Sequence, residues 1–154
     1  MIPANKTISI LHPYVHKQWG AVKMMIYLSN FLYKKNNRVI LYTLSYNKTL
    51  FKKYEIEFTI KTCIGRWLRK MFSFFKIAYM IRNSDFIIIW NSPMHFVWVL
   101  SKVLFFSRAK LIWWNHHYPW YYGSNTKQFT KLKQVFEKCV VKRIDVILAN
   151  SQYL

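Results

Sequence analysis

Neutral polar side chains directly follow several short apolar segments of this sequence, where the ends of parallel strands would place ligand-binding groups. These groups are His12-Pro13, Asn91-Ser92-Pro93, Asn115-His116-His117 and Asn150-Ser151. No carboxylate is placed in this way, because Asp85 and Asp145 precede apolar segments instead of following them. Amide and imidazole groups suit hydroxyl-rich ligands such as sugars, and a histidine can transfer protons. We therefore expect either histidine chemistry or chemistry supplied by a second domain.

The first of these loops leads from an apolar segment into a predicted helix that begins near Gly20-Ala21. Backbone N–H groups at a helix start with small residues can bind phosphate. The sequence contains neither a GxGxxG nor a GxxxxGK[ST] motif, which disfavours dinucleotide binding and a P-loop. An ordinary connection between a strand and a helix is the alternative interpretation of this loop.

The pair His116-His117 precedes an aromatic loop that runs from Tyr118 to Gly123. Adjacent side chains of an extended chain point in opposite directions, so we expect no metal shared by the two histidines. The aromatic rings could stack on sugars, or they could instead form a packed cap over the edge of a sheet. The two cysteines, Cys63 and Cys139, have neither zinc-site nor disulfide-framework spacing, which fits a reducing cytoplasm.

The elements that must position these groups alternate between short β-branched or aromatic runs and longer segments with helical periodicity. Strands are predicted at Thr7–Leu11, Arg38–Thr43, Glu55–Ile60, Asp85–Trp90, Lys110–Asn115 and Asp145–Ala149, and helices at Ala21–Lys35, Arg66–Asn83, Met94–Phe106 and Lys127–Arg143. We interpret 45–53 as a loop or a short helical turn. This alternation predicts an α/β fold, a Rossmann-like doubly wound parallel sheet with strand order 3-2-1-4-5-6. The first strand would then lie at its centre.

The charge of the chain is strongly unbalanced, with 24 Lys and Arg against 5 Asp and Glu and a formal net charge of +19. Such a field attracts phosphate groups on nucleic acid, anionic lipid or a phosphorylated substrate. The 7 Trp, 11 Tyr and 12 Phe residues favour a membrane interface among these partners. We expect no nucleic-acid partner, because the predicted strands look buried on both faces. No apolar run reaches the ~20 residues of a transmembrane helix.

The predicted helix Arg66–Asn83 has more apolar surface than one contact with a sheet can bury. Basic residues beside that surface indicate contact with anionic lipid. The predicted membrane contacts are Arg66, Trp67, Arg69, Lys70 and Phe74. A neighbouring element that covers the outer face of this helix is the alternative. We expect a cytoplasmic protein, peripheral on the inner face of a membrane.

These segments together resemble the N-terminal domain of retaining glycosyltransferases of family 4, which have the GT-B fold. The similar stretches are Trp19-Gly20-Ala21-Val22-Lys23, Phe86–Pro93, Leu111–His116 and Asp145-Val146-Ile147-Leu148-Ala149-Asn150-Ser151. The resemblance spans nearly the whole chain. Two departures from the family pattern are Trp19, where a first glycine is usual, and Val22, where an acid is usual.

The resemblance implies two Rossmann-like domains around a cleft, with this chain, residues 1–154, as the N-terminal, acceptor-side domain. It places Gly20 and Ala21 near the donor phosphates and His116 near the transferred sugar. Other predicted cleft residues, taken from the ends of strands, are His12, Asn91, His117, Tyr118, Asn150 and Ser151. Because Asn150-Ser151 resembles the start of a helix, we expect that the C-terminal donor-binding domain is missing from a truncated chain.

The resulting hypothesis is a glycosyltransferase domain that acts on a nucleotide-sugar and on a lipid-linked or polysaccharide acceptor. Neither a cofactor nor a metal ion is expected, only the nucleotide-sugar as donor substrate. The alternative is a non-catalytic truncated domain that binds an anionic membrane or a phosphorylated glycan.

Overall fold

The computed structural model of the chain describes residues 3–15, 20–52, 54, 56–62, 67–90, 94–115, 142 and 144–149. Six strands form one parallel sheet: β1 (Thr7–Leu11), β3 (Arg38–Thr43), β5 (Thr59–Thr62), β6 (Phe86–Ile89), β7 (Lys110–Asn115) and β8 (Val146–Ala149). Their spatial order is β5-β3-β1-β6-β7-β8. This order confirms the predicted 3-2-1-4-5-6 arrangement. The first strand, β1, lies between β3 and β6, which are the second and fourth predicted strands.

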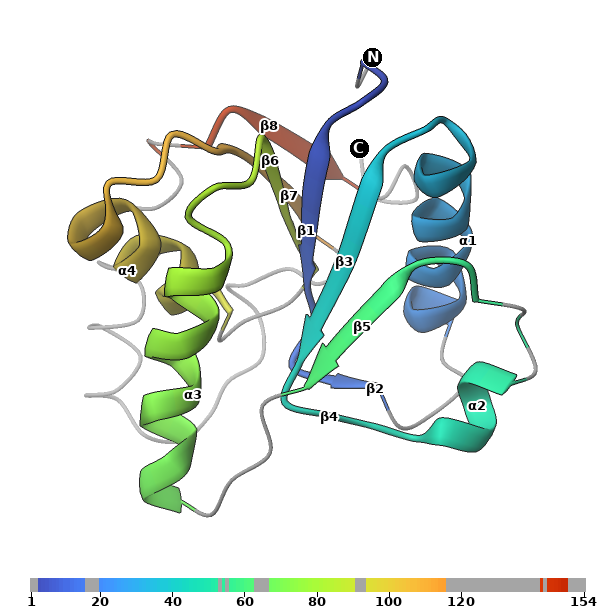
Figure 1. Ribbon diagram of the computed structural model, residues 1–154, viewed down its shortest axis with the longest axis horizontal. Coiled ribbons are helices and arrows are strands. Elements are labelled where there is room, and N and C mark those ends of the chain that lie inside the picture. The colour runs from blue at the N-terminus through green and yellow to red at the C-terminus, as the bar shows by residue number, and fades with distance from the viewer. Residues whose placement is uncertain are drawn as a thin grey trace.

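Helices cover both faces of the sheet (Figure 1). Helix α1 (Gly20–Lys34) lies on one face, and helices α3 (Trp67–Met80) and α4 (His95–Phe105) lie on the other. A short helix, α2 (Lys48–Lys52), lies between β3 and β5. The three predicted helices in this part of the chain are confirmed to within a few residues at each end. The predicted helix Lys127–Arg143 lies outside the described residues.

The apolar runs of the strands are continuous because each strand contributes to a core on either side of the sheet. On β6, Ile88 packs into the cluster under α1, whereas Ile87 and Ile89 pack into the cluster under α3 and α4. All three side chains are buried. Successive side chains of a strand point to opposite faces, so a strand covered on both faces needs apolar residues at every position.

The edge strand β5 begins later than the predicted strand Glu55–Ile60. The backbone N–H of Glu57 donates to the Asn30 side chain on α1, at 3.4 Å, and not to the neighbouring strand β3. Its carboxylate pairs with Lys34 of the same helix, at 3.2 Å. The chain at residue 57 is therefore attached to α1, and pairing with β3 starts only at Thr59.

The segment after β3 also contains more structure than the predicted loop or helical turn. Strand β4 (Ser45–Tyr46) pairs in parallel with strand β2 (Tyr14–Val15) and forms a second, two-stranded sheet. The backbone N–H of Leu44 donates to the Pro13 carbonyl, at 3.0 Å, and the Thr43 hydroxyl donates to the same oxygen, at 3.2 Å. The connections after β1 and β3 are thereby held together beyond the main sheet.

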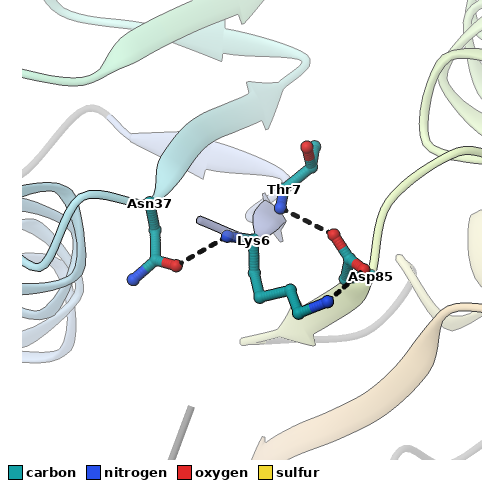
Figure 2. A network of polar contacts seen from close by, with 4 residues as sticks. All are labelled: Lys6, Thr7, Asn37 and Asp85. Carbon is teal, nitrogen blue, oxygen red and sulfur yellow. Dashed lines mark hydrogen bonds and ion pairs between the residues drawn. The ribbon is translucent and has the colours of Figure 1, made fainter. Parts of the chain in front are cut away.

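Two aspartates fasten the amino ends of the strands, which agrees with their expected position away from the ligand-binding edge. Asp85 accepts a hydrogen bond from the backbone N–H of Thr7, at 2.8 Å, and pairs with Lys6, at 3.3 Å (Figure 2). Asp145 accepts one from the backbone N–H of Leu111, at 2.7 Å. The hydrogen bond from Thr7 is the main cause that lowers the pKa of Asp85 below its usual value of 3.8.

Replacing Asp85 with asparagine is expected to lower the free energy of unfolding at neutral pH by about 1 kcal/mol, since this half-exposed carboxylate loses its charge. A lowered pKa in the folded state means that the carboxylate stabilises the fold above its unfolded pKa of 3.8. That contribution disappears as the pH falls through the lower, folded value. Urea unfolding of both proteins at neutral pH and below pH 3.8 should therefore show a difference that shrinks with acid. A difference that does not change with pH would contradict this role of the charge.

Candidate functional site at the carboxyl edge of the sheet

The carboxyl ends of the parallel strands bring the predicted site segments to one edge of the sheet. Leu11 of β1 is in register with Ile89 of β6, and Ile89 with Trp113 of β7. Asn115 at the end of β7 is in register with Ala149 at the end of β8. The predicted site residues Asn91, His116 and Asn150 follow these ends in the sequence. Ligands of open parallel sheets bind outside this edge.

Among the predicted cleft residues, the described part of the chain contains only His12. Asn91, His116, His117, Tyr118, Asn150 and Ser151 lie outside the described residues. The backbone N–H of His12 donates to the Tyr42 carbonyl at the end of β3, at 3.1 Å, and its side chain is buried. His12 thus lies between the ends of two strands, and its burial favours a supporting position over direct contact with a large substrate.

Gly20 and Ala21 begin α1, as the sequence predicts for a phosphate-binding helix start. Ala21 packs against the core under α1, whereas Gly20 is exposed. A Cβ atom added at Gly20 would meet no atom within 4 Å, and its φ angle is not positive. Neither crowding nor backbone conformation therefore requires a glycine here. The first turn of α1 contains no acidic residue that would oppose an anion at its N–H groups.

A pair of tryptophan rings supports the edge between β6 and β7. Trp90, which follows β6, is fully buried, and its ring stacks on Trp114 of β7 with centroids 4.3 Å apart and planes 28° apart. Both rings pack with the core under α1, which also includes Val22 from the first turn of that helix. The stack therefore connects the start of α1 to the two strands that lead into Asn91 and His116. Sequence reasoning missed it, although the two aromatic residues at neighbouring strand ends were a usable signal.

The predicted membrane contacts fall on or just before α3. Arg66 lies outside the described residues, and the side chains of Trp67, Arg69 and Lys70 are not described. Phe74 is half-buried and packs against the core under α3 and α4. Among the described side chains of this helix, the exposed rings are instead Phe72, Phe75 and Tyr79, spaced at i, i+3 and i+7. No helix in the described part of the chain is both long and apolar enough to span a membrane.

No group of three or more His, Cys, Asp or Glu side chains that could hold a metal ion occurs among the described residues. The two described aspartates are used at the opposite edge of the sheet, in the contacts with Thr7 and Leu111. The site that the described residues build therefore consists of backbone N–H groups, neutral side chains and aromatic rings.

Comparisons with known proteins bear on the family and the fold of the chain. The family model of Glycosyltransferase Family 4 matches residues 20–154. Two solved structures of HepE from Anabaena, in complex with UDP-glucose and with UDP and glucose, are similar to the chain with TM-scores of 0.70 and 16% sequence identity. Each covers 96% of this chain, whereas the match covers 38% and 39% of the HepE chains, so the chain spans less than two fifths of their length. Among curated proteins, none matches the sequence.

Proposed function

The chain belongs to glycosyltransferase family 4, and we propose that it is the acceptor-side half of a two-domain enzyme that transfers a sugar from a nucleotide-sugar. The observation that carries this proposal is the family match over residues 20–154, which includes the segments that follow β3, β6, β7 and β8 but not residues 12–19 between β1 and α1. The expected family resemblance and Rossmann-like fold are both confirmed. The donor-binding half would come from a second domain.

A nucleotide-sugar donor, of the UDP-sugar class, fits the described part of the site. HepE has been solved with UDP-glucose and with UDP and glucose. In our proposal, the N–H groups at Gly20 and Ala21 lie near the donor phosphates and stabilise the nucleoside diphosphate as it leaves. The unexplained glycine supports this role, because a ligand that approaches the backbone closely would account for the missing side chain.

The remaining proposed roles belong to the loops after the strands. We assign His116 to the cleft beside the transferred sugar, where it can donate a hydrogen bond or accept a proton in the transition state. The residues proposed to contact the acceptor or line the cleft are Asn91, His117, Tyr118, Asn150 and Ser151. His12, predicted as a cleft residue, is buried and is proposed to support this edge from between the strand ends. In the reaction, the bond between the sugar and the diphosphate breaks, an acceptor hydroxyl forms the new glycosidic bond, and that hydroxyl releases its proton.

A lipid-linked or polysaccharide acceptor at the inner face of a membrane is the proposed second substrate. The formal net charge of +19 supports this assignment, because it would draw the protein to anionic headgroups or to a phosphate-linked acceptor. The same charge favours one second candidate function. This candidate is a non-catalytic domain that binds an anionic membrane or a phosphorylated glycan without turnover.

The 154-residue chain alone is expected to transfer no sugar, because one wall of the proposed cleft is missing. A fusion of the chain to the part of HepE outside the matched region should transfer label from UDP-glucose to an acceptor in a membrane lipid and polysaccharide extract. The measurement is incorporation of radiolabelled glucose, with UDP-glucose binding by the fusion as the control. Turnover by the chain alone would contradict the two-domain proposal. A fusion that binds UDP-glucose but neither transfers nor hydrolyses it would favour the non-catalytic candidate.

A further inference from the structure

The outward side of α3 is aromatic, which is unusual for a helix on the surface of a soluble protein. Phe72, Phe75 and Tyr79 are 74%, 40% and 48% exposed. The opposite side of the same helix already packs on the sheet through Ile77 and Ala78, which are fully buried. A surface helix needs only one apolar stripe, and its outward side is normally polar. The second apolar stripe of α3 therefore stays largely exposed in the described structure, although its Tyr79 ring contacts Phe105 and Arg82.

Helix α4 continues this apolar surface. The two helices pack against each other, and the rings of Tyr79 and Phe105 meet edge to face with centroids 5.4 Å apart. Figure 1 shows both helices on the face of the sheet that lies opposite α1. The exposed apolar side chains of α3, α4 and the residue after α4 are Phe72, Phe75, Tyr79, Phe96, Val103, Leu104 and Phe106, and we call them the aromatic face. Apolar patches of this kind mark sites of interaction with proteins or membranes.

Phe106, the residue directly after α4, is unfavourable in water for two reasons. Its ring is 83% exposed. Its backbone has φ 51° and ψ 34°, the left-handed conformation that glycine or asparagine usually adopts at the end of a helix. A glycine would relieve the backbone strain and remove the exposed ring. A phenylalanine at this position is thus unfavourable for the isolated domain and becomes favourable only if the ring enters an apolar environment.

One basic side chain, Arg82, contacts the aromatic face, and three more lie on α3, on α4 or shortly after α4. The guanidinium of Arg82 lies 3.8 Å from the centroid of the Tyr79 ring, and the ammonium of Lys102 lies 6.0 Å from that of the Trp98 ring. Lys76 and Arg108 are exposed. In the sequence from 61 to 108 the only acidic residue is Asp85, which is paired with Lys6 at 3.3 Å. The surroundings of the aromatic face are therefore positive. A positive surface complements an anionic partner and disfavours a protein partner that has few acidic residues.

We propose that the aromatic face is the surface with which this protein docks on a bilayer that contains anionic phospholipid. The aromatic rings enter the headgroup region, and Lys76, Arg82, Lys102 and Arg108 lie among the phosphates. The inference extends the proposed function, because it names the surface that would bring the cleft to a membrane-borne acceptor. It rests on the exposed residues and charges alone, so it is tested without any measurement of sugar transfer.

Phe106→Gly is the sharpest test, because the two readouts should move in opposite directions. The thermal unfolding midpoint of the free chain should stay unchanged or rise. Affinity for vesicles of phosphatidylglycerol and phosphatidylcholine, measured by co-sedimentation, should fall about tenfold, since one buried phenyl ring is lost. A ring with a merely structural role would give a lower midpoint and unchanged affinity, which would overturn the proposal at this residue.

A matched pair of helix-surface variants distinguishes binding through the aromatic face from nonspecific binding through any exposed ring. Phe72→Ala on α3 should weaken vesicle binding about tenfold. Phe31→Ala on α1 should leave it unchanged, because Phe31 is also exposed but lies on the other face of the sheet. Equal weakening by both variants would contradict docking through α3 and α4.

Charge variants test the anionic partner. Lys76→Gln with Arg108→Gln should weaken binding to anionic vesicles at low salt by about fivefold per residue. The matched pair Lys23→Gln, on α1, with Lys35→Gln, directly after α1, should weaken it less. Binding should weaken with added salt but leave a remainder that Phe72→Ala removes. Equal binding to neutral and anionic vesicles would overturn the proposal. A dimer in light scattering that Phe72→Ala dissolves, or tighter binding to RNA than to vesicles at the same salt, would overturn it in favour of a second copy or nucleic acid.

The outcomes separate this inference from the proposed function. If the fusion transfers sugar normally to a soluble acceptor but does not bind vesicles, the docking surface is contradicted and the proposed enzyme function stands. If the fusion binds vesicles normally but transfers no sugar, the docking surface stands and the proposed enzyme function is contradicted.

Discussion

Replacing His116 with alanine in the fusion enzyme is expected to lower the rate of sugar transfer by about 100-fold or more, the usual contribution of a positioned group that transfers or shares a proton. His116 follows directly after β7, whose last residue, Asn115, is in register with Ala149 at the edge of the sheet. The measurement is kcat and KM for UDP-glucose. The loss should appear mainly in kcat, because the proposed contact strengthens in the transition state.

His12→Ala is the matched control for this prediction. His12 is buried between the ends of β1 and β3, and its backbone N–H bonds to Tyr42 at 3.1 Å. Its replacement should reduce stability more than it reduces kcat in the protein that remains folded. Equal losses of kcat in the two variants would remove the role proposed for His116, and a His116→Ala enzyme with normal kcat would do so as well.

Replacing Trp90 with alanine is expected to lower the free energy of unfolding by about 3–5 kcal/mol, the usual cost of deleting a large buried aromatic side chain. The Trp90 ring is fully buried under α1 and stacks on Trp114 with centroids 4.3 Å apart. Such a loss is a large part of the total stability of a domain, about 5–15 kcal/mol. Urea unfolding followed by circular dichroism measures the change without relying on tryptophan fluorescence.

Two variants set the scale for the Trp90 result. Trp90→Phe keeps an aromatic ring in the stack and should cost less than half as much as Trp90→Ala. Phe31→Ala removes an exposed ring from α1 and should change the free energy of unfolding by no more than about 0.5 kcal/mol. If Trp90→Ala costs no more than Phe31→Ala, the stack does not hold the strand ends together as we describe.

Local patterns in the sequence were enough to predict the sheet and the position of its two aspartates. Continuous apolar segments such as Phe86–Ile89 indicated strands covered on both faces, and the intervening helices indicated parallel connections. Asp85 and Asp145 precede their strands, so parallel pairing alone placed them at the edge away from ligands. The Gly20-Ala21 helix start was also predictable, because it depends only on residues that are close in the sequence.

Contacts between distant residues decided the details that the sequence did not reveal. The start of β5 depends on Asn30 and Lys34 of α1, which bind Glu57 and keep it out of the sheet. The strands β2 and β4 have only two residues each, and they can pair only because β1 and β3 are neighbours. Propensity cannot predict a strand of that length, since its stability comes from the partner.

The direction of the apolar side chains was likewise outside the reach of the sequence. Helix α3 is apolar on most of its circumference, so periodicity could not tell that Phe74 packs inward while Phe72 and Phe75 face outward. The left-handed backbone of Phe106 and the burial of His12 depend on where α4 and the strand ends meet their neighbours. The sequence by itself determined the family and the order of the elements, and it predicts the edge at which ligands would bind. Only the tertiary structure decided which apolar and polar groups remain exposed there, because exposure is set by the packing of segments far apart in the chain.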